Sequence, residues 1–490
     1  MPAKQLRWWS RDKAKRRRFA SPVARRRFTF RKTQRFGRAG EPPSVHGEFM
    51  KQPFVNSGYY REQMDKSLHM KYYVAQKLIN GGKSMSNGEL YKGAFFEHFE
   101  GLDDKRQEGK VLHKLIDVLF IVLSGVICGF DEWDDIHFWA EASSNQEWFK
   151  KYIALANGIP SLSTIKRIFS SIKPKEFQAS FVDWMKSAIE LPSKDVVAID
   201  GKTSKGSKNK NKNIKPIHIV SALCHSHGLV MGQTKTEEKS NEITAISELL
   251  DQLFIEGCIV TIDAMGAQKK IVKKIVNDNK ADYVINLKGN QETLQEEVKG
   301  YFNDLEQSGE LEKVQNQTQK APLNVANDSD KLGVHSTLEK GHGRIEKRTY
   351  FYSTDNTWLV DAKQDWEKLT GIGKVIREVE YLAEPNKKTV ETAYYIGSVD
   401  NVSDFAAAAR NHWSVESMHW SLDVTFGDDS NKTQEKIAAQ NMALVKRIVF
   451  NTLRSEKTIR PKLSTPKKRL NALLNPDYRD ALIDLNFKER

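Results

Sequence analysis

The sequence has 490 residues, and at about 100–200 residues per domain this length predicts about two to four domains. Hydrophobic residues make up 39%, as in globular proteins, and three cysteines exclude a disulfide framework, so we expect buried thiols in a reducing, cytoplasmic compartment. The net charge of +14 belongs to one segment, because residues 1–40 hold 15 of the 77 basic and one of the 63 acidic side chains, leaving 62 of each elsewhere.

The basic segment 1–40 has runs of Lys and Arg among Trp and Phe residues, a composition that can neutralise the phosphates of DNA. Two other interpretations stand beside a DNA-binding arm: a solvated disordered arm, and an extension from an upstream start. The internal alternative starts are Met50, Met64, Met70 and Met85. We expect residues 1–95 to be a basic, disordered N-terminal extension and a chain beginning at Met85 to fold.

Residues 96–190 are expected to form a helical N-terminal, DNA-binding domain. The stretch 112–130 is almost wholly apolar beyond Asp117 but is shorter than the ~20 residues of a membrane span, so it predicts a buried core helix and no membrane association. Further helices are predicted at 133–141, 146–155 and 163–172. The last carries Lys166 and Arg167, as a DNA-binding helix does, although packing on neighbouring helices explains it equally well.

Two short apolar runs each end in an aspartate. Val196–Thr203 contains Asp200 followed by glycine, and Cys258–Ala264 contains Asp263. If the runs are neighbouring parallel strands, both carboxylates emerge at the carboxyl edge of a sheet, where α/β proteins bind ligands. Close carboxylates repel unless a cation or a proton lies between them, and Mg²⁺ favours such sites. The alternative is that each aspartate only caps the helix that follows.

The order of elements around these runs decides how the strands are arranged. A predicted hairpin at 217–235 follows the Asp200 strand. Then come a helix at 241–253, the Asp263 strand, a helix at 267–279 and a strand at 283–287. Three strands followed by alternating helices and strands are typical of a ribonuclease H-like mixed sheet. In that sheet the first and fourth strands are neighbours.

The chain from about 293 to 400 has a different pattern. A polar helix and a polar loop precede three predicted strands, at 348–353, 375–382 and 392–399, and we interpret this region as a β-rich insertion. A helical pattern resumes at Asp404. Along it Glu416, His419 and Asp423 share one face, so Glu416 is either a solvated acid or a ligand. We expect residues 191–455 to be one domain with this insertion and 456–490 to be a helical tail.

Five motifs occur in one order: Ala198–Thr203, Thr236–Ile246, Thr261–Gln268, Leu287–Gln291 and Arg410–Glu416. Together they closely resemble the ISAs-type, H-repeat-associated group of DDE transposases. The resemblance runs from about residue 96 to the end and includes the stretch Lys468–Ala472. Residues 1–95 lie largely outside it.

The resemblance implies an acid triad of Asp200, Asp263 and Glu416, both catalytic and metal-binding. Related insertion-sequence enzymes surround the glutamate with Tyr-x2-Arg-x3-Glu-x6-Lys. The matching positions here are Ala409, His412, Glu416 and Asp423, so only the acid remains. Asp423 lies two helical turns beyond Glu416 on the same face and is therefore an alternative third acid.

The resemblance also implies the chemistry: hydrolysis of a phosphodiester at the ends of a mobile element, then transfer of the freed strand into target DNA. Two Mg²⁺ ions, with Mn²⁺ as a substitute, would serve both steps, and Asp200 would be shared between them. Weaker expectations for DNA contacts are Lys202, Lys288, Asn290, Gln291 and His412.

The expected partner is double-stranded DNA, both the terminal inverted repeats of the insertion sequence and the target, bound by a homo-oligomer associated with a bacterial nucleoid. The expected architecture is α/β: a ribonuclease H-like domain with a β-rich insertion, preceded by a helical domain and a disordered basic tail. Two alternatives stay open. One is an inactive or domesticated relative that binds DNA without cutting, and the other is a metal-dependent endonuclease without strand transfer.

Overall fold

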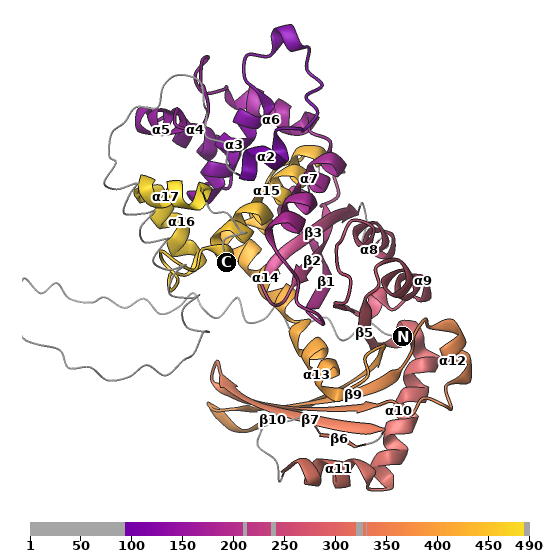
Figure 1. The fold of residues 1–490 in the computed structure, drawn as a ribbon. Coiled ribbons are helices and arrows are strands. Elements are labelled where there is room, and N and C mark those ends of the chain that lie inside the picture. The colour runs from indigo at the N-terminus through magenta and orange to yellow at the C-terminus, as the bar shows by residue number, and fades with distance from the viewer. Residues whose placement is uncertain (1–93, 209–212, 237–241, 320–326, 330, 485–490) are drawn as a thin grey trace, which may run out of the picture. The chain divides into compact units, whose positions relative to one another are not determined.

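The computed structural model describes residues 94–208, 213–236, 242–319, 327–329 and 331–484 (Figure 1). All of them belong to one compact unit, Ser86–Arg490. The expectations for the basic segment 1–40 and for the internal methionines before residue 94 fall outside the described residues.

Helices alone make up the first described part of the chain. They are α2 (Ala94–Phe99), α3 (Leu115–Ile127), α4 (Trp133–Glu141), α5 (Ser143–Phe149), α6 (Leu162–Ser171) and α7 (Pro174–Ala188). The predicted core helix is confirmed, since every residue of α3 from Val118 to Ile127 is buried. Phe120 lies at its centre with Phe96, Trp148 and Tyr152 around it. Among the described residues, no helix has the length and apolar character needed to cross a membrane.

The predicted ribonuclease H-like sheet follows. Its strands are β1 (Val196–Thr203), β2 (His218–Cys224), β3 (Leu229–Thr236), β4 (Ile259–Ile262) and β5 (Asp282–Leu287). The spatial order β3-β2-β1-β4-β5, with β1, β4 and β5 parallel, confirms the predicted arrangement. The crossover helices are α8 (Glu242–Leu250) and α9 (Lys269–Lys273), and α9 continues as a π turn over Lys274–Asp278.

The β-rich region extends this same sheet. Its strands are β6 (Asn327–Ser329), β7 (Leu332–Gly341), β8 (Arg344–Ser353), β9 (Gly371–Tyr381) and β10 (Glu384–Gly397). Its helices are α10 (Glu292–Gln307), α11 (Glu310–Gln319) and α12 (Val360–Asp365). Because β10 pairs antiparallel with β5, with Tyr394 opposite Leu287, the ten strands form one continuous sheet.

Helices return at the end of the chain: α13 (Val402–Asn411), α14 (Ser414–Phe426), α15 (Lys436–Ser455), α16 (Thr465–Leu474) and α17 (Pro476–Ile483). Figure 1 shows α14 and α15 on one face of β1–β3 and α8 on the other. The helix predicted to run on from Asp404 is interrupted, because the chain turns at His412 and Trp413. There the Val415 N–H bonds to the His412 carbonyl and starts a new helix.

Candidate active site

The register of two strands determines where the aspartates lie. In the parallel ladder of β1 and β4, Ile199 pairs with Ile262, so Asp200 and Asp263 each follow the last paired residue at the same edge. Ile199 is fully buried, as are the two residues before it, and Asp200 is the first residue of β1 with partial exposure. A strand that is apolar and buried on both faces therefore places a carboxylate at the carboxyl edge of the sheet.

The three predicted acids line one cleft at this edge. Asp200, Asp263 and Glu416 are all part of its wall, together with Lys288 and Trp413. Glu416 lies in the first turn of α14, which packs through its buried residues Val415, Met418 and Leu422. A carboxylate in the first turn of a helix faces the positive end of the helix dipole.

Each acid has its own electrostatic surroundings. Burial raises the pKa of Asp200, but the hydrogen bond from His419 and the electrostatic interaction with its imidazole outweigh this effect, so the pKa lies below its usual range. Burial, and then the charge of Asp200, raise the pKa of Asp263. The same two causes raise the pKa of Glu416. Asp200 therefore repels both other carboxylates of the cleft, and such a set of oxygen donors suits divalent cations.

The alternative role as a helix cap applies to one oxygen of Asp263. Its Oδ1 accepts the Met265 N–H at 3.0 Å at the start of a short 3-10 helix, and this leaves Oδ2 for the cleft. Among the described residues, one group has three ligand atoms all within 4.8 Å of one another, and the three acids do not form it.

That compact group is Asp195, Cys224 and His227, at the other end of β1. The Asp195 carboxylate accepts hydrogen bonds from the Val196 N–H and from the N–H and hydroxyl of Ser226. Burial raises the pKa of the Cys224 thiol to about 12, which opposes the thiolate form that binds metals. The group stabilises the turn between β2 and β3.

Two histidines lie beside the acids. His419 is buried, and its Nδ1 is 3.4 Å from Asp200 Oδ2. His412 lines the cleft, its Nδ1 is 3.1 Å from Thr261 Oγ1, and burial lowers its pKa, which favours the neutral form. The sequence grouped His419 with Glu416 on one helical face, but its contact with Asp200 followed only from the way α14 packs on β1.

Lys202 contacts acids rather than the cleft. Its side chain is 11% exposed, and its Nζ lies 2.5 Å from Asp423 Oδ1 and 3.2 Å from Asp429 Oδ1. Asp423, the alternative third acid, is not part of the cleft wall. Lys202 therefore joins β1 to the far end of the helix that carries Glu416.

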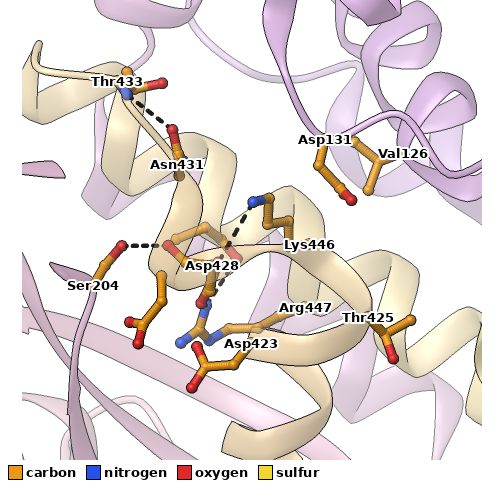
Figure 2. Close-up of polar contacts among 12 residues, drawn as sticks. Val126, Asp131, Ser204, Asp423, Thr425, Asp428, Asn431, Thr433, Lys446 and Arg447 are labelled. Carbon is orange, nitrogen blue, oxygen red and sulfur yellow. Dashed lines mark hydrogen bonds and ion pairs between the residues drawn. The ribbon is translucent and has the colours of Figure 1, made fainter. Parts of the chain in front are cut away.

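A buried polar cluster continues this junction (Figure 2). Asp428 lies between Lys446 and Arg447 of α15, at 3.7 Å from each, and its backbone carbonyl accepts the Ser204 hydroxyl. Lys446 and Arg447 are fully buried, so α15 fixes the turn after α14 from inside the protein. The cluster holds the exit of β1 and the end of α14 together.

The remaining predicted contacts lie in the loop after β5. Lys288 is exposed and lines the cleft. The Asn290 side chain donates to the Ala264 carbonyl at 2.6 Å, and Gln291 donates to the Ala267 carbonyl at 2.9 Å. Both amides therefore support the loop that carries Asp263.

Sequence reasoning missed a buried pair behind Asp200. His218 Nε2 and Glu242 Oε2 lie 3.5 Å apart, and the Thr203 hydroxyl is 2.8 Å from the other ring nitrogen. A Cβ on Gly201 would overlap the Glu242 carboxylate, so this position requires glycine. The signal was present, since both Gly201 and Glu242 belong to motifs of the resemblance, but a motif does not reveal that the two are in contact.

Comparisons with known proteins cover most of the chain. The family model described as "Transposase DDE domain" matches residues 191–452, and the model "DDE_Tnp_1-associated" matches residues 96–185. The putative transposase YncI of Escherichia coli O157:H7 is 37% identical over 387 residues, which are 79% of this chain and 93% of the relative. The H repeat-associated putative transposase YhhI of Escherichia coli K12 is 37% identical over 78% of this chain and 95% of its own.

A solved structure, the piggyBac transposase synaptic complex with hairpin DNA, superposes with a TM-score of 0.37 and 11% identity, over 80% of this chain and 77% of that one.

Proposed function

This chain belongs to the DDE transposase family, and from that membership we propose that it cuts DNA strands at the ends of an insertion sequence and joins them to target DNA. The observation that carries the proposal is the meeting of Asp200, Asp263 and Glu416 in one cleft. They come from three separate elements: β1, the end of β4 and α14. Helix capping alone does not explain why three acids from separate elements lie in one cleft.

Asp200, Asp263 and Glu416 would hold two divalent cations, Mg²⁺ or Mn²⁺, with Asp200 shared. The chemistry that such cations supply is activation of the attacking oxygen and stabilisation of the leaving oxyanion. His419 keeps Asp200 ionised, because its hydrogen bond and charge offset the effect of burial on the pKa. Lys288 is the exposed cation of the cleft wall, and its place beside Glu416 suits a contact with a DNA phosphate.

The substrate would be duplex DNA, with the terminal repeats of the element and the target bound by a homo-oligomer. We assign the recognition of the repeats to the helical part, residues 96–190. The family model matching 96–185 accompanies the catalytic model, and this association supports the assignment.

The test replaces each acid with its amide: Asp200→Asn, Asp263→Asn and Glu416→Gln. Each change should reduce Mg²⁺-dependent cleavage of terminal-repeat DNA by at least about 100-fold, the scale of losing one group that stabilises developing charge. DNA binding should change little, and so should the melting temperature of Asp263→Asn and Glu416→Gln, because the site loses a repulsive charge. Asp200→Asn also loses its contact with buried His419, so this variant should melt at a somewhat lower temperature. Glu297→Gln, an exposed acid on α10, is the matched control.

The alternatives correspond to distinct outcomes of this assay. Cleavage without joining to target DNA would identify a nuclease. Binding without cleavage by the unaltered chain would identify an inactive relative. A large loss of melting temperature in Asp263→Asn or Glu416→Gln, measured without divalent cations, would contradict the catalytic assignment and favour structural capping.

A further inference from the structure

A second cavity lies at the opposite end of β1 from the three acids. It is formed by the turn between β2 and β3, the C-terminal end of α15 and the start of α16. The His225 N–H bonds to the Val196 carbonyl, which places this turn beside the first residue of β1. Asp200 is four residues further along, or about 13 Å at the rise of a β-strand. The two sites are therefore separate.

The wall of this cavity is positively charged. The charge comes from Arg454 and Lys457, and the wall also contains the His225 ring and the hydroxyls of Ser464 and Thr465. Strong positive charge also extends past the cavity, because the segment 454–468 holds six Lys or Arg and a single acid.

That acid, Glu456, is already compensated. Its side chain is fully buried, and Oε1 accepts three backbone N–H groups, of residues 458 to 460. Lys468 Nζ lies 3.1 Å from Oε2, and the Tyr478 hydroxyl donates to the same oxygen. The opposite charges of Glu456 and Lys468 cancel, so the net positive charge of the cavity comes from the other basic groups.

Arg454 is the exposed guanidinium of the cavity. Gly228 lies beneath it with φ of +67°, and a Cβ there would come within 2.8 Å of Nη2, so the glycine lets the guanidinium lie over the turn. Within the described part of the chain, the Arg454 side chain has no hydrogen bond or ion pair. By contrast, Arg348 and Arg377 both bind Glu346. Arg454 therefore has its donors available.

The surroundings indicate a polyanion. Arg460, Lys462 and Lys467 are exposed beside the cavity, and none has an ion pair among the residues that the structure describes. A single free phosphate would occupy the cavity and leave these three basic side chains without a partner. A nucleic-acid backbone carries repeated negative charges that can bind both the cavity and these side chains, and its counterions are released when it binds.

We propose that this cavity, with Arg454 as its principal donor, binds a backbone phosphate of duplex DNA away from the cleavage site. The inference rests on the proposed function, since the DNA is the transposase substrate. Because the cavity and the cleft lie at opposite ends of β1, about 13 Å apart along the strand, the bound phosphate is a different one from the phosphate that is cut.

The test compares the unaltered chain with Arg454→Gln, using fluorescence anisotropy of a terminal-repeat duplex without divalent cations between 50 and 200 mM salt, about the range over which phosphate contacts dominate affinity. The variant should bind about tenfold more weakly, as expected for one charged hydrogen-bonded contact. The slope of the logarithm of affinity against the logarithm of salt concentration should be shallower by about 0.9.

Two further variants serve as controls. Arg454→Lys should retain most of this slope. Lys313→Gln, an exposed lysine on α11, controls for general loss of charge.

A neutral methylphosphonate placed at successive positions of the duplex locates the contact. The unaltered chain should lose affinity at one position other than the cut phosphate, and Arg454→Gln should be insensitive there. Equal affinity and slope for Arg454→Gln and the unaltered chain would overturn the inference. The inference would also be overturned if inorganic phosphate occupied the cavity and the affinity for DNA did not change. Failure of the unaltered chain to cleave would count against the proposed function alone, because binding is measured separately.

Discussion

Glu416 and Asp423 are seven residues apart on α14. At this spacing the two side chains lie on the same side of the helix but about 10 Å apart along its axis. Glu416 reaches the cleft, whereas Asp423 lies against Lys202 and does not line the cleft. The lysine that joins Asp423 to β1 also contacts Asp429, so these residues form a clamp beyond the cleft.

We predict that Asp423→Asn weakens this clamp without removing a catalytic group. The Asp423 side chain is 31% exposed, so the loss should be about 1–2 kcal/mol and the melting temperature should fall by about 2–4 °C. Cleavage should stay within about tenfold of the unaltered chain, the scale of a small misplacement. Asp429→Asn, the other partner of Lys202, is the matched variant and should behave alike. Abolished cleavage at an unchanged melting temperature would assign the third acid to Asp423.

At the scale of elements, the ladder between β8 and β9 contains a conflict of charge. Arg348 and Arg377 are direct cross-strand partners, and like charges in that position repel. Glu346 resolves the conflict because its Oε1 accepts Arg377 Nε at 2.6 Å and also binds Arg348. Burial raises the pKa of Glu346, but the hydrogen bond from Arg377 and the charges of the neighbouring arginines outweigh it, so the pKa lies below its usual range.

This environment predicts a pH-dependent contribution to stability. A pKa lowered by folding stabilises the protein fully above the unfolded value, about 4.3, and the contribution is lost as the pH falls through the folded pKa. Glu346→Gln should therefore cost about 3 kcal/mol at pH 7, with a difference from the unaltered chain that shrinks toward pH 3. Urea unfolding at several pH values measures it. Glu391→Gln removes a 66% exposed partner of Arg377 and should cost little. A difference that grows as the pH falls would contradict the assignment.

The elements around the acids could be predicted because their patterns are local. Buried strands such as β1 appear as apolar runs, and the hairpin of β2 and β3 has a glycine at its turn. In contrast, β7 was missed, since its sequence from Leu332 to Gly341 is mostly polar and only its first residues are buried. The contacts of Lys202 and Glu242 could not be predicted, because they depend on how separate elements pack.

At the scale of the whole molecule, α15 connects the helical part to the sheet. Asn441 donates to the Phe169 and Ile172 carbonyls at the end of α6. Ten residues later, Asn451 donates to the Val230 carbonyl of β3 and accepts the Val230 N–H. Both asparagines are buried, so each one satisfies backbone groups that would otherwise lack partners.

Arg469 of α16 makes a second connection, and its loss should weaken the whole unit. It is buried, it binds both oxygens of Asp131, and it donates to the carbonyls of Val126 and Thr425. Arg469→Met should cost about 3 kcal/mol, because a partly buried carboxylate and two carbonyls lose their donor.

Urea unfolding of the unaltered chain, followed by both near-UV and far-UV circular dichroism, should give one shared transition that moves to lower urea in this variant. Lys467→Met, an exposed position on the same helix, should leave the midpoint in place. Two resolved transitions would mean that the helical part and the sheet unfold independently.

The continuous sheet has a consequence for how this protein can diverge or be re-engineered. The strands beyond β5 attach through backbone hydrogen bonds, which are largely indifferent to side-chain identity, so exposed positions of these strands such as Leu338 and Val390 are free to drift in sequence. Buried positions are not: at Gly371 and Gly373, for example, the rings of Tyr352 and Phe405 occupy the space of a side chain. The turn at Gly343, with φ of +72° and open space around it, is where a foreign loop can be grafted at least cost to the cleft.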